Sequence, residues 1–532
     1  MNQAEARRRQ AEALSDILMF VAIYVLGGLT GDNGITYTAV AVQICTLFWI
    51  MISGGLSDAL GRLLRSRKNK GQYRNIARMR GSAMLFQSIL GLAVSLCLAA
   101  LSGVVAEKLF RIPYSGLILL AMSPAVLLRT VSAVLAGYFQ GEGSEAPRAI
   151  AGILRQAFLL GFGILFCHLV GGYGEKVGSL LRQENFAAMY GGLGIALAVN
   201  LAELPVILFL GLVYRGSRRS ERRAKQEGMY AADSAWDCAR YLHSARWPHW
   251  ATDLCVFLPF ALGLLFLGGS GEAGGQTAVD YGLYVGKYLV VCGIVTALVR
   301  IAVLPVIARI FQCFKRDENR FARTVFQSGV HIGLVHGIFL AVFVAVMGEQ
   351  IADLLHPVNA QTAARMLRQG SALIVLVPLC GYFRRLLHAM GKKYSVLAAA
   401  CGADVVFSIA VLAGMGKAGV LSLVYGGLAA GGVLCVVLGV FAYRQMRVQP
   451  DWLGTFAIPL GAGGVAGLIC LLMRKLFAAR LGSLAMLLVA LAVAGLIYWI
   501  LLLLLRNFKE QELEVVPGGR LIGRLGQLLR IF

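Results

Sequence analysis

Apolar residues occur in runs of about 20 along nearly the whole chain, and short segments rich in Lys, Arg, Gly or Pro separate the runs. A membrane-spanning α-helix needs about 20 consecutive apolar residues to cross a hydrocarbon layer of about 30 Å. The pattern therefore predicts about 14 membrane-spanning helices. The expected fold class is an all-α polytopic membrane protein without a separate soluble domain.

The predicted spans follow from the apolar runs and their charged flanks. They cover residues 13–31, 36–61, 81–104, 115–139, 148–171, 187–214, 247–268, 281–310, 322–347, 369–390, 394–414, 419–442, 454–473 and 482–505. Residues 1–214 form the first predicted lobe, residues 215–246 a basic cytoplasmic linker and residues 247–442 the second lobe. Spans 13 and 14 (443–505) and a cytoplasmic tail (506–532) complete the chain.

Composition and charge agree with this pattern. Of the 532 residues, 58% are hydrophobic and only 14% are charged, whereas soluble domains average about 25% charged residues. A net charge of +23 would suggest nucleic-acid binding in a soluble protein, but here the basic residues lie in short loops. We therefore expect the lipid bilayer, and no nucleic acid, as the partner of these charges.

Lys and Arg are unevenly distributed between alternate loops. Most lie on the side that holds both termini, above all in residues 62–80 and in the linker. Because basic loops stay in the cytoplasm, this asymmetry predicts an N-in/C-in topology. Arg474, Lys475 and Arg480 disagree, since they fall on the opposite side. The charged start, MNQAEARRRQ, is interpreted as the flank of an uncleaved first span.

Two short motifs indicate an internal repeat. YFQGEG (138–143) ends the fourth predicted span and LLHAMG (386–391) ends the tenth, and in each case the next span follows at once. An even number of spans separates the two motifs, so the two lobes would share one orientation and be related by an axis along the membrane normal. Such duplication is typical of transporters.

Basic residues within the spans are candidate groups for binding an anionic substrate head group. The candidates are Lys287, Arg300 and Arg129. Arg155 also lies within a predicted span, but no function is predicted for it. A charged side chain at mid-membrane is costly, so each needs a partner or a function. Lys287 and Arg300 lie in one span but on different faces of an ideal helix. Lys287 is therefore favoured for a cavity and Arg300 as the partner of an acid.

Acidic residues within the spans are candidates for a coupling-ion site. Asp253 in span 7 and Asp404 in span 11 lie at similar depth, and two facing carboxylates could share a proton or bind Na⁺. The alternative is that each is separately hydrogen-bonded. Glu203 in span 6 is either the acid that pairs with Arg300 or a second proton site. Asp16, near the cytoplasmic end of span 1, is interpreted as an interfacial anchor.

The sequence contains no pattern typical of an enzyme. GxSxG, HExxH and Walker motifs are absent, and no long segment outside the predicted spans could hold a nucleotide or donor-sugar site. The cysteines form no CxxC pair and the histidines lack metal-ligand spacing. We expect a transporter with no cofactor beyond a coupling ion, Na⁺ or H⁺, and no metal beyond Na⁺ at Asp253 and Asp404.

Several strings resemble a known superfamily. GGLSDALGRLLRSRKNKGQYRNIAR (54–78), GYFQGEGSEAPRAI (137–150), and YGLYVGK (281–287) with LPVIARIF (304–311) are spread from span 2 to span 8. With the predicted span count, they resemble the multidrug/oligosaccharidyl-lipid/polysaccharide (MOP) exporters, which join multidrug extruders with polysaccharide and lipid-linked oligosaccharide flippases. Within this superfamily, the chain is similar to the polysaccharide biosynthesis proteins that include the stage V sporulation protein B group and the lipid II flippases.

The resemblance implies two pseudo-symmetric six-helix lobes around a central cavity, plus a C-terminal helix pair that forms a groove for a lipid tail. It implies an undecaprenyl-pyrophosphate-linked saccharide, such as lipid II or a polysaccharide precursor, as the substrate in the bacterial plasma membrane. Lys287 matches a position where lipid II flippases carry a basic residue. Asp253 and Asp404 match carboxylates that form a sodium site in some members.

Two departures concern the expected site. Lipid II flippases carry arginines in spans 1 and 2, whereas span 1 here holds Asp16 and the matching part of span 2 reads FWIMISGG (48–55), without a cation. Ala400 stands one turn before Asp404, where the sodium site has an amide. The head-group contacts and the coupling ion therefore stay open.

Two other functions fit parts of the sequence. A multidrug/cation antiporter of the same superfamily would need an acidic cavity for cationic drugs, whereas the candidates here are mixed in charge. A scaffold that does not transport would recruit envelope-synthesis enzymes through the linker and the tail. The tail sequence LIGRLGQLLRIF (521–532) has leucines and arginines suited to an anionic membrane surface, and membrane anchoring is its simpler role.

Overall fold

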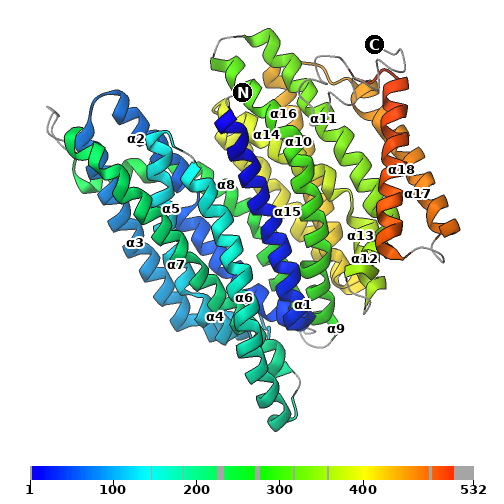
Figure 1. Cartoon of the computed structure of the whole chain (residues 1–532), viewed down its shortest axis with the longest axis horizontal. Helices are drawn as coiled ribbons and strands as arrows, with labels where there is room; N and C mark the ends of the chain where they lie inside the picture. Colours follow the sequence, from blue (N-terminus) through cyan, green and yellow to red (C-terminus); the bar gives the residue numbers. More distant parts are fainter. Residues whose placement is uncertain are drawn as a thin grey trace. The chain divides into compact units, whose positions relative to one another are not determined.

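The computed structural model describes residues 3–144, 146–183, 185–224, 233–269, 276–315, 318–355, 359–477 and 482–508. Within these ranges all regular secondary structure is helical (Figure 1). Part of the basic linker (225–232) and most of the tail (509–532) lie outside the described residues, and so do the predictions made for them.

The helices follow one another with short connections, and each predicted span coincides with one helix or with consecutive helices. Their bounds are α1 (Gln3–Ser53), α2 (Leu56–Asn69), α3 (Tyr73–Gly103), α4 (Ser115–Met122), α5 (Pro124–Glu142), α6 (Ala146–Leu181), α7 (Asn185–Ala224), α8 (Ala235–Gly269), α9 (Gln276–Leu283), α10 (Leu289–Lys315), α11 (Asn319–Val346), α12 (Gly348–Leu355), α13 (Ala360–Gly370), α14 (Leu373–Ala389), α15 (Lys393–Ala418), α16 (Leu421–Met446), α17 (Ile458–Phe477) and α18 (Ser483–Leu504). Three π-helical segments are η1 (Val104–Leu109), η2 (Tyr284–Tyr288) and η3 (Leu453–Ala457).

Among the described residues, 12 helical stretches are long and apolar enough to cross a membrane. The pair α13 and α14, bent by 47° at a short break, is a thirteenth if it forms one span. These stretches confirm the predicted class of an all-α, multi-pass membrane protein. The number of 14 spans and the N-in/C-in topology stay predictions.

One of the 12 stretches is too long for a single span. Ala11–Asn69 has 59 residues, which at 1.5 Å per residue would measure about 88 Å, nearly three times the hydrocarbon thickness. Gly31 interrupts α1 with φ 74° and ψ 169°, a conformation that in practice only glycine adopts. This kink lies at the end of the first predicted span, so the chain can cross once before it and once after it.

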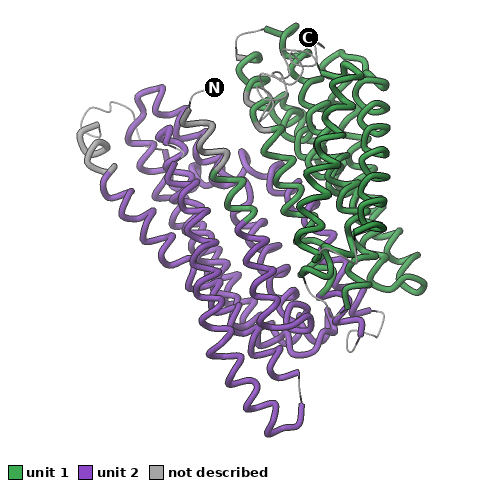
Figure 2. Tube along the Cα trace, turned by 45° about the vertical axis from the view of Figure 1, so that its right-hand side comes forward, with its two compact units in different colours: residues 1–17, 283–532 green, residues 18–282 purple. Residues whose placement is uncertain are grey.

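Contacts divide the chain into two compact units, which are described separately (Figure 2). Unit 2 comprises residues 18–282, and unit 1 comprises residues 1–17 and 283–532. The predicted lobes divide the chain at the linker instead. The two divisions differ in residues 1–17, which belong to unit 1, and in α8 and most of α9, which belong to unit 2. α8, the seventh predicted span, packs against α2 and α3 within unit 2.

In unit 2, the second predicted span is not one continuous helix. Gly54 and Gly55 separate α1 from α2, and Gly55 adopts a φ of 64°. Arg246 of α8, which is 2% exposed, lies at this break. Its Nη2 donates to the carbonyl of Met51 at 3.0 Å, and its Nη1 donates to the carbonyl of Ile52. The last carbonyls of a helix have no partner within the helix, so the guanidinium satisfies them and complements the helix dipole.

In unit 1, the C-terminal helices α17 and α18 pack against each other and against α11. α17 contains a GxxxG motif, formed by Gly463 and Gly467. Gly467 lies so close to α11 that a Cβ atom added to it would be 2.8 Å from Val342 Cγ1. On α18, the Tyr498 hydroxyl donates to the carbonyl of Val335 at 2.8 Å. The predicted C-terminal helix pair is thus attached to unit 1 through α11.

We expect Arg246→Leu to lower the melting temperature of the purified protein in detergent. The change removes two hydrogen bonds from a charged donor, each worth about 1.5–3 kcal/mol, and leaves two carbonyls of α1 without these donors. Arg246→Lys should recover only part of the loss, because an ammonium group lacks the planar fork of the guanidinium. Arg240→Leu, an exposed position on the same helix, is the control. Equal melting temperatures for the two leucine variants would contradict this role of Arg246.

Candidate functional site

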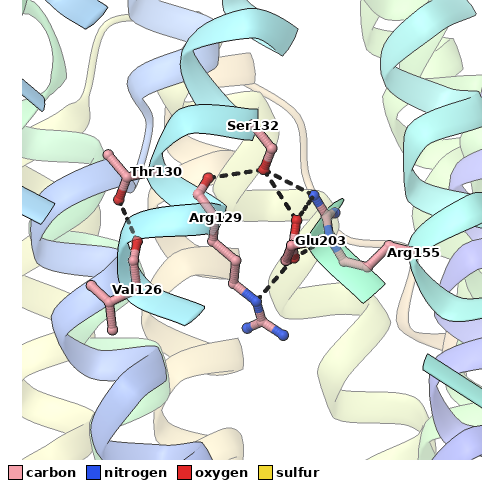
Figure 3. Close-up of polar contacts among 6 residues, drawn as sticks. All are labelled: Val126, Arg129, Thr130, Ser132, Arg155 and Glu203. Carbon is pink, nitrogen blue, oxygen red and sulfur yellow. Dashed lines mark hydrogen bonds and ion pairs between the residues drawn. The ribbon is translucent and has the colours of Figure 1, made fainter. Parts of the chain in front are cut away.

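A polar cluster in unit 2 joins α5, α6 and α7 (Figure 3). Glu203 of α7 accepts hydrogen bonds at both oxygens from Arg155 of α6, with Nε–Oε1 2.6 Å and Nη2–Oε2 3.2 Å. The Nε of Arg129, on α5, lies 3.3 Å from Oε1. Ser132, one turn further along α5, donates from its hydroxyl to Oε2 at 3.3 Å. Glu203 therefore has two basic partners and one hydroxyl partner.

Burial distinguishes the acid of this cluster from its bases. The side chain of Glu203 is 0% exposed, whereas Arg129 and Arg155 are 27% and 28% exposed. A carboxylate buried in a membrane span is stable only with donors around it, and the two arginines supply them. Two roles were predicted for Glu203, and the structure places it beside arginines. These are Arg129 and Arg155 rather than Arg300.

Lys287 lies in a π-helical turn of the eighth predicted span. η2 interrupts the helix between α9 and α10, and Lys287 is 6% exposed within it. The hydroxyl of Tyr288 donates to the carbonyl of Gly370 at 3.0 Å, where α13 ends and the chain bends into α14. The rings of Tyr284 and Tyr288 stack with centroids 5.5 Å apart. Because π-helical turns often occur at functional sites, the turn that holds Lys287 is a candidate site of unit 1.

Arg300 and Asp16 form an ion pair within unit 1. Arg300 lies on α10, and Asp16 lies near the N-terminal end of α1. The exposed fractions of the two side chains are 32% and 35%. Asp16, which was predicted to be an interfacial anchor, is thus an ion-pair partner. The pair neutralises the charge of Arg300, so the geometry supports the predicted role of Arg300 as the partner of an acid.

The two candidate coupling carboxylates lie in different units. Asp253 lies on α8 between Pro248 and Pro259, in unit 2. Asp404 lies on α15 in unit 1 and is 9% exposed. Because the two residues belong to different units, the pairing of Asp253 with Asp404 stays a prediction. The prolines around Asp253 remove backbone donors from α8 and permit it to bend.

Sequence reasoning gave no role to Arg155, which makes the shortest contact with Glu203. A signal was present, because the two residues carry opposite charges in consecutive spans joined by a short turn, and such spans are usually neighbours. The contact between Tyr288 and Gly370 had no comparable signal. It joins two segments far apart in the sequence, and hydrophobic periodicity does not distinguish a π-helical turn from an α-helix.

No protein-family model matches the chain. The chain is 19% identical over 534 residues to stage V sporulation protein B of Bacillus subtilis (strain 168), which covers 97% of this chain and 96% of the relative. The lipid II flippase MurJ, in an inward closed conformation, matches the structure with a TM-score of 0.66 and 12% identity, over 93% of this chain and 97% of the flippase. A multidrug resistance transporter of the MATE family, in an inward-facing conformation, matches with a TM-score of 0.62 and 12% identity, over 83% of this chain and 98% of the transporter.

The chain is similar over nearly its whole length to stage V sporulation protein B, and its fold is that of solved transporters that include a member of the MOP superfamily. This similarity agrees with the resemblance that the strings between spans 2 and 8 indicated. It also agrees with the multi-pass membrane protein that the helices describe. Lys287 and the cluster of Arg129, Arg155 and Glu203 thus lie within a fold that the chain shares with these solved transporters.

We expect Asp16→Asn and Arg300→Gln each to lower the melting temperature of the purified protein, because each leaves one charge of the pair without its partner. The double variant should recover most of the loss, since it removes both charges. A coupling energy of about 1–3 kcal/mol in this double-mutant cycle is expected for residues in direct contact. Additive effects of the two substitutions would show that the pair does not form in the protein.

Proposed function

We propose that this chain is an ion-coupled flippase that moves a polyprenyl-pyrophosphate-linked saccharide across the bacterial plasma membrane by alternating access. The saccharide would be that of lipid II or of another polysaccharide precursor. Its anionic head group would cross inside the protein while the lipid tail remains in the apolar phase beside α17 and α18. The chain would therefore act as a transporter and not as an enzyme.

The observation that carries this proposal is the burial of Lys287 in a π-helical turn within a membrane span. An ammonium group inside a membrane is costly, and low polarity strengthens its attraction to an anion. Pyrophosphate is the anionic part of the proposed substrate. The turn also provides a place where the span can change its twist, which a moving helix needs.

The relatives support a lipid-linked substrate. The lipid II flippase structure covers 93% of this chain, whereas multidrug structures with the same fold cover 83%. Structures similar to this chain include inward-facing, outward-facing and inward closed conformations. That range of conformations supports an alternating-access mechanism.

We propose that Asp253 and Asp404 supply the carboxylates for the coupling ion, Na⁺ or H⁺. Carboxylate oxygens are suitable ligands for a hard cation, and two carboxylates can also share a proton. Glu203 is less suitable, because two arginines and Ser132 already occupy its oxygens.

A multidrug antiporter is the second candidate, because multidrug transporters share the fold. Cationic drugs would need negative groups within the membrane. The charged groups within the spans are instead mixed: unit 2 holds a cluster of two arginines and one glutamate as well as Asp253, and unit 1 holds a buried Lys287 as well as Asp404. A scaffold for envelope-synthesis enzymes would depend on the linker and the tail. Part of the linker (225–232) and most of the tail (509–532) lie outside the described residues.

We expect Lys287→Gln to abolish the flipping of lipid II in proteoliposomes without changing the amount of folded protein. Lys287→Arg should retain part of the activity, because it keeps the positive charge. Lys417→Gln, an exposed lysine on α15, is the control and should flip normally. Normal flipping by Lys287→Gln would contradict the assigned role. Uptake of a cationic dye by the same proteoliposomes, with no flipping of lipid II, would favour the multidrug antiporter.

A second test concerns the support of the Lys287 turn. We expect Tyr288→Phe to slow flipping several-fold, because it removes the hydroxyl that holds η2 to the carbonyl of Gly370. Tyr382→Phe is a matched control, since Tyr382 is also buried and donates to a backbone carbonyl, that of Phe326, at 3.0 Å. Both variants should lose similar stability, about 1 kcal/mol, measured by thermal unfolding. Equal flipping rates for the two variants would show that the Tyr288 contact does not position Lys287.

A further inference from the structure

The Arg129, Arg155 and Glu203 cluster does not balance its charges. Two guanidinium groups share one carboxylate, which leaves one positive charge, and the remaining contact of Glu203, from Ser132, is neutral. Arg129 lies near the middle of the Ser115–Glu142 stretch, far from either end of its span. An ion network that serves only structure would be expected to balance its charges at such a depth, because an excess charge is costly there.

The geometry leaves one end of Arg129 available. Among the described residues, its hydrogen bond is made by Nε alone, at 3.3 Å from Glu203 Oε1. Figure 3 shows its two Nη atoms directed away from Glu203. Arg155, in contrast, binds Glu203 through both Nε and Nη2. The two Nη atoms of Arg129 therefore form the edge of the guanidinium group that can donate hydrogen bonds to two oxygens of a phosphate group.

The two arginines are also accessible while their acid is not. Arg129 is 27% exposed and Arg155 is 28% exposed, but Glu203 is 0% exposed. Part of each arginine side chain is therefore not covered by the described residues, whereas the carboxylate that would repel an anion is covered. The next residue, Thr130, accepts a hydrogen bond from Ser53 of α1 at 2.8 Å, which fixes this part of α5 against the end of α1.

We propose that Arg129 and Arg155, oriented by Glu203 and Ser132, form a second anion-binding site, in unit 2, for a phosphate or pyrophosphate group. Arg129 makes the direct contact through its Nη atoms. Arg155 supplies the excess charge and, with Glu203, positions Arg129. The inference rests on the proposed function in one respect, namely that the phosphate is carried by the lipid-linked saccharide. Binding at this site is measurable without transport.

The test is the melting temperature of the full-length protein in detergent, with and without three probes: inorganic pyrophosphate, undecaprenyl pyrophosphate and phosphatidylglycerol. A ligand that binds only the folded state raises the melting temperature. We expect both pyrophosphate probes to stabilise the unsubstituted protein by several degrees. In Arg129→Gln this shift should become smaller, and adding Lys287→Gln should abolish the shift that remains. Without ligand, Arg129→Gln should melt at the same temperature as the unsubstituted protein or higher, because it removes the excess charge. Arg129→Lys, which keeps the charge but loses the fork, should show a smaller shift.

Two further variants separate binding from structure. Arg155→Gln should lower the melting temperature without ligand, because Glu203 loses its bidentate partner. Arg148→Gln is the matched control on the same helix, since Arg148 pairs with Asp58 at 2.8 Å outside the cluster, and it should keep the full ligand shift.

Several outcomes would overturn the proposal. One is a lower melting temperature for Arg129→Gln without ligand together with an unchanged ligand shift, which would make the cluster purely structural. Another is the absence of a shift in the unsubstituted protein with either pyrophosphate probe. An equal shift with phosphatidylglycerol would overturn the assignment to the lipid-linked saccharide. The absence of any shift would also count against pyrophosphate binding at Lys287. The other results leave lipid II flipping through Lys287, which is measured separately, unaffected.

Discussion

The bilayer interior contains no water, so each backbone polar group and each charge inside it must find a partner in the protein. This constraint explains why all described regular structure is helical, since an α-helix satisfies its own backbone. It also explains how the helices are interrupted. The break at Gly55 brings the last carbonyls of α1 to Arg246, and the bend after Gly370 brings a carbonyl to the hydroxyl of Tyr288. Irregular backbone occurs where a side chain from another helix supplies the missing donor.

The same constraint distinguishes ion pairs with balanced charges from clusters that carry an excess charge. Arg300 and Asp16 are a one-to-one pair, which is the arrangement expected of a structural contact. Arg129, Arg155 and Glu203 carry one excess positive charge. Lys287 lies in a π-helical turn, although an α-helical backbone would be more stable at this position. These two departures from the balanced, regular arrangement are the places that we propose for contact with an anionic substrate.

Much of the fold could be predicted from the sequence, because the length of an apolar run and the thickness of a bilayer are local properties. The predicted spans therefore coincide with the observed helices, and the kink at Gly31 lies at a predicted boundary. The break at Gly55 was missed because residues 56–61, the first residues of α2, were included in the apolar run of the second predicted span. Arg246 was assigned to the linker, although it is buried against α1, because its partners are backbone carbonyls that no sequence pattern reveals. Of the candidate site, Lys287, Arg129 and Glu203 could be selected as charges within spans, but their partners depend on which helices pack together.

The central claim is that the chain carries a polyprenyl-pyrophosphate-linked saccharide. Native mass spectrometry of the protein, purified in mild detergent, tests this claim most directly, because it measures the mass of a lipid that remains bound. The account predicts a bound species with the mass of a polyprenyl pyrophosphate that carries a saccharide, and that mass would identify the saccharide. Detection of bulk phospholipid alone, even after incubation with lipid II, would contradict the account and favour drug export or a scaffold role.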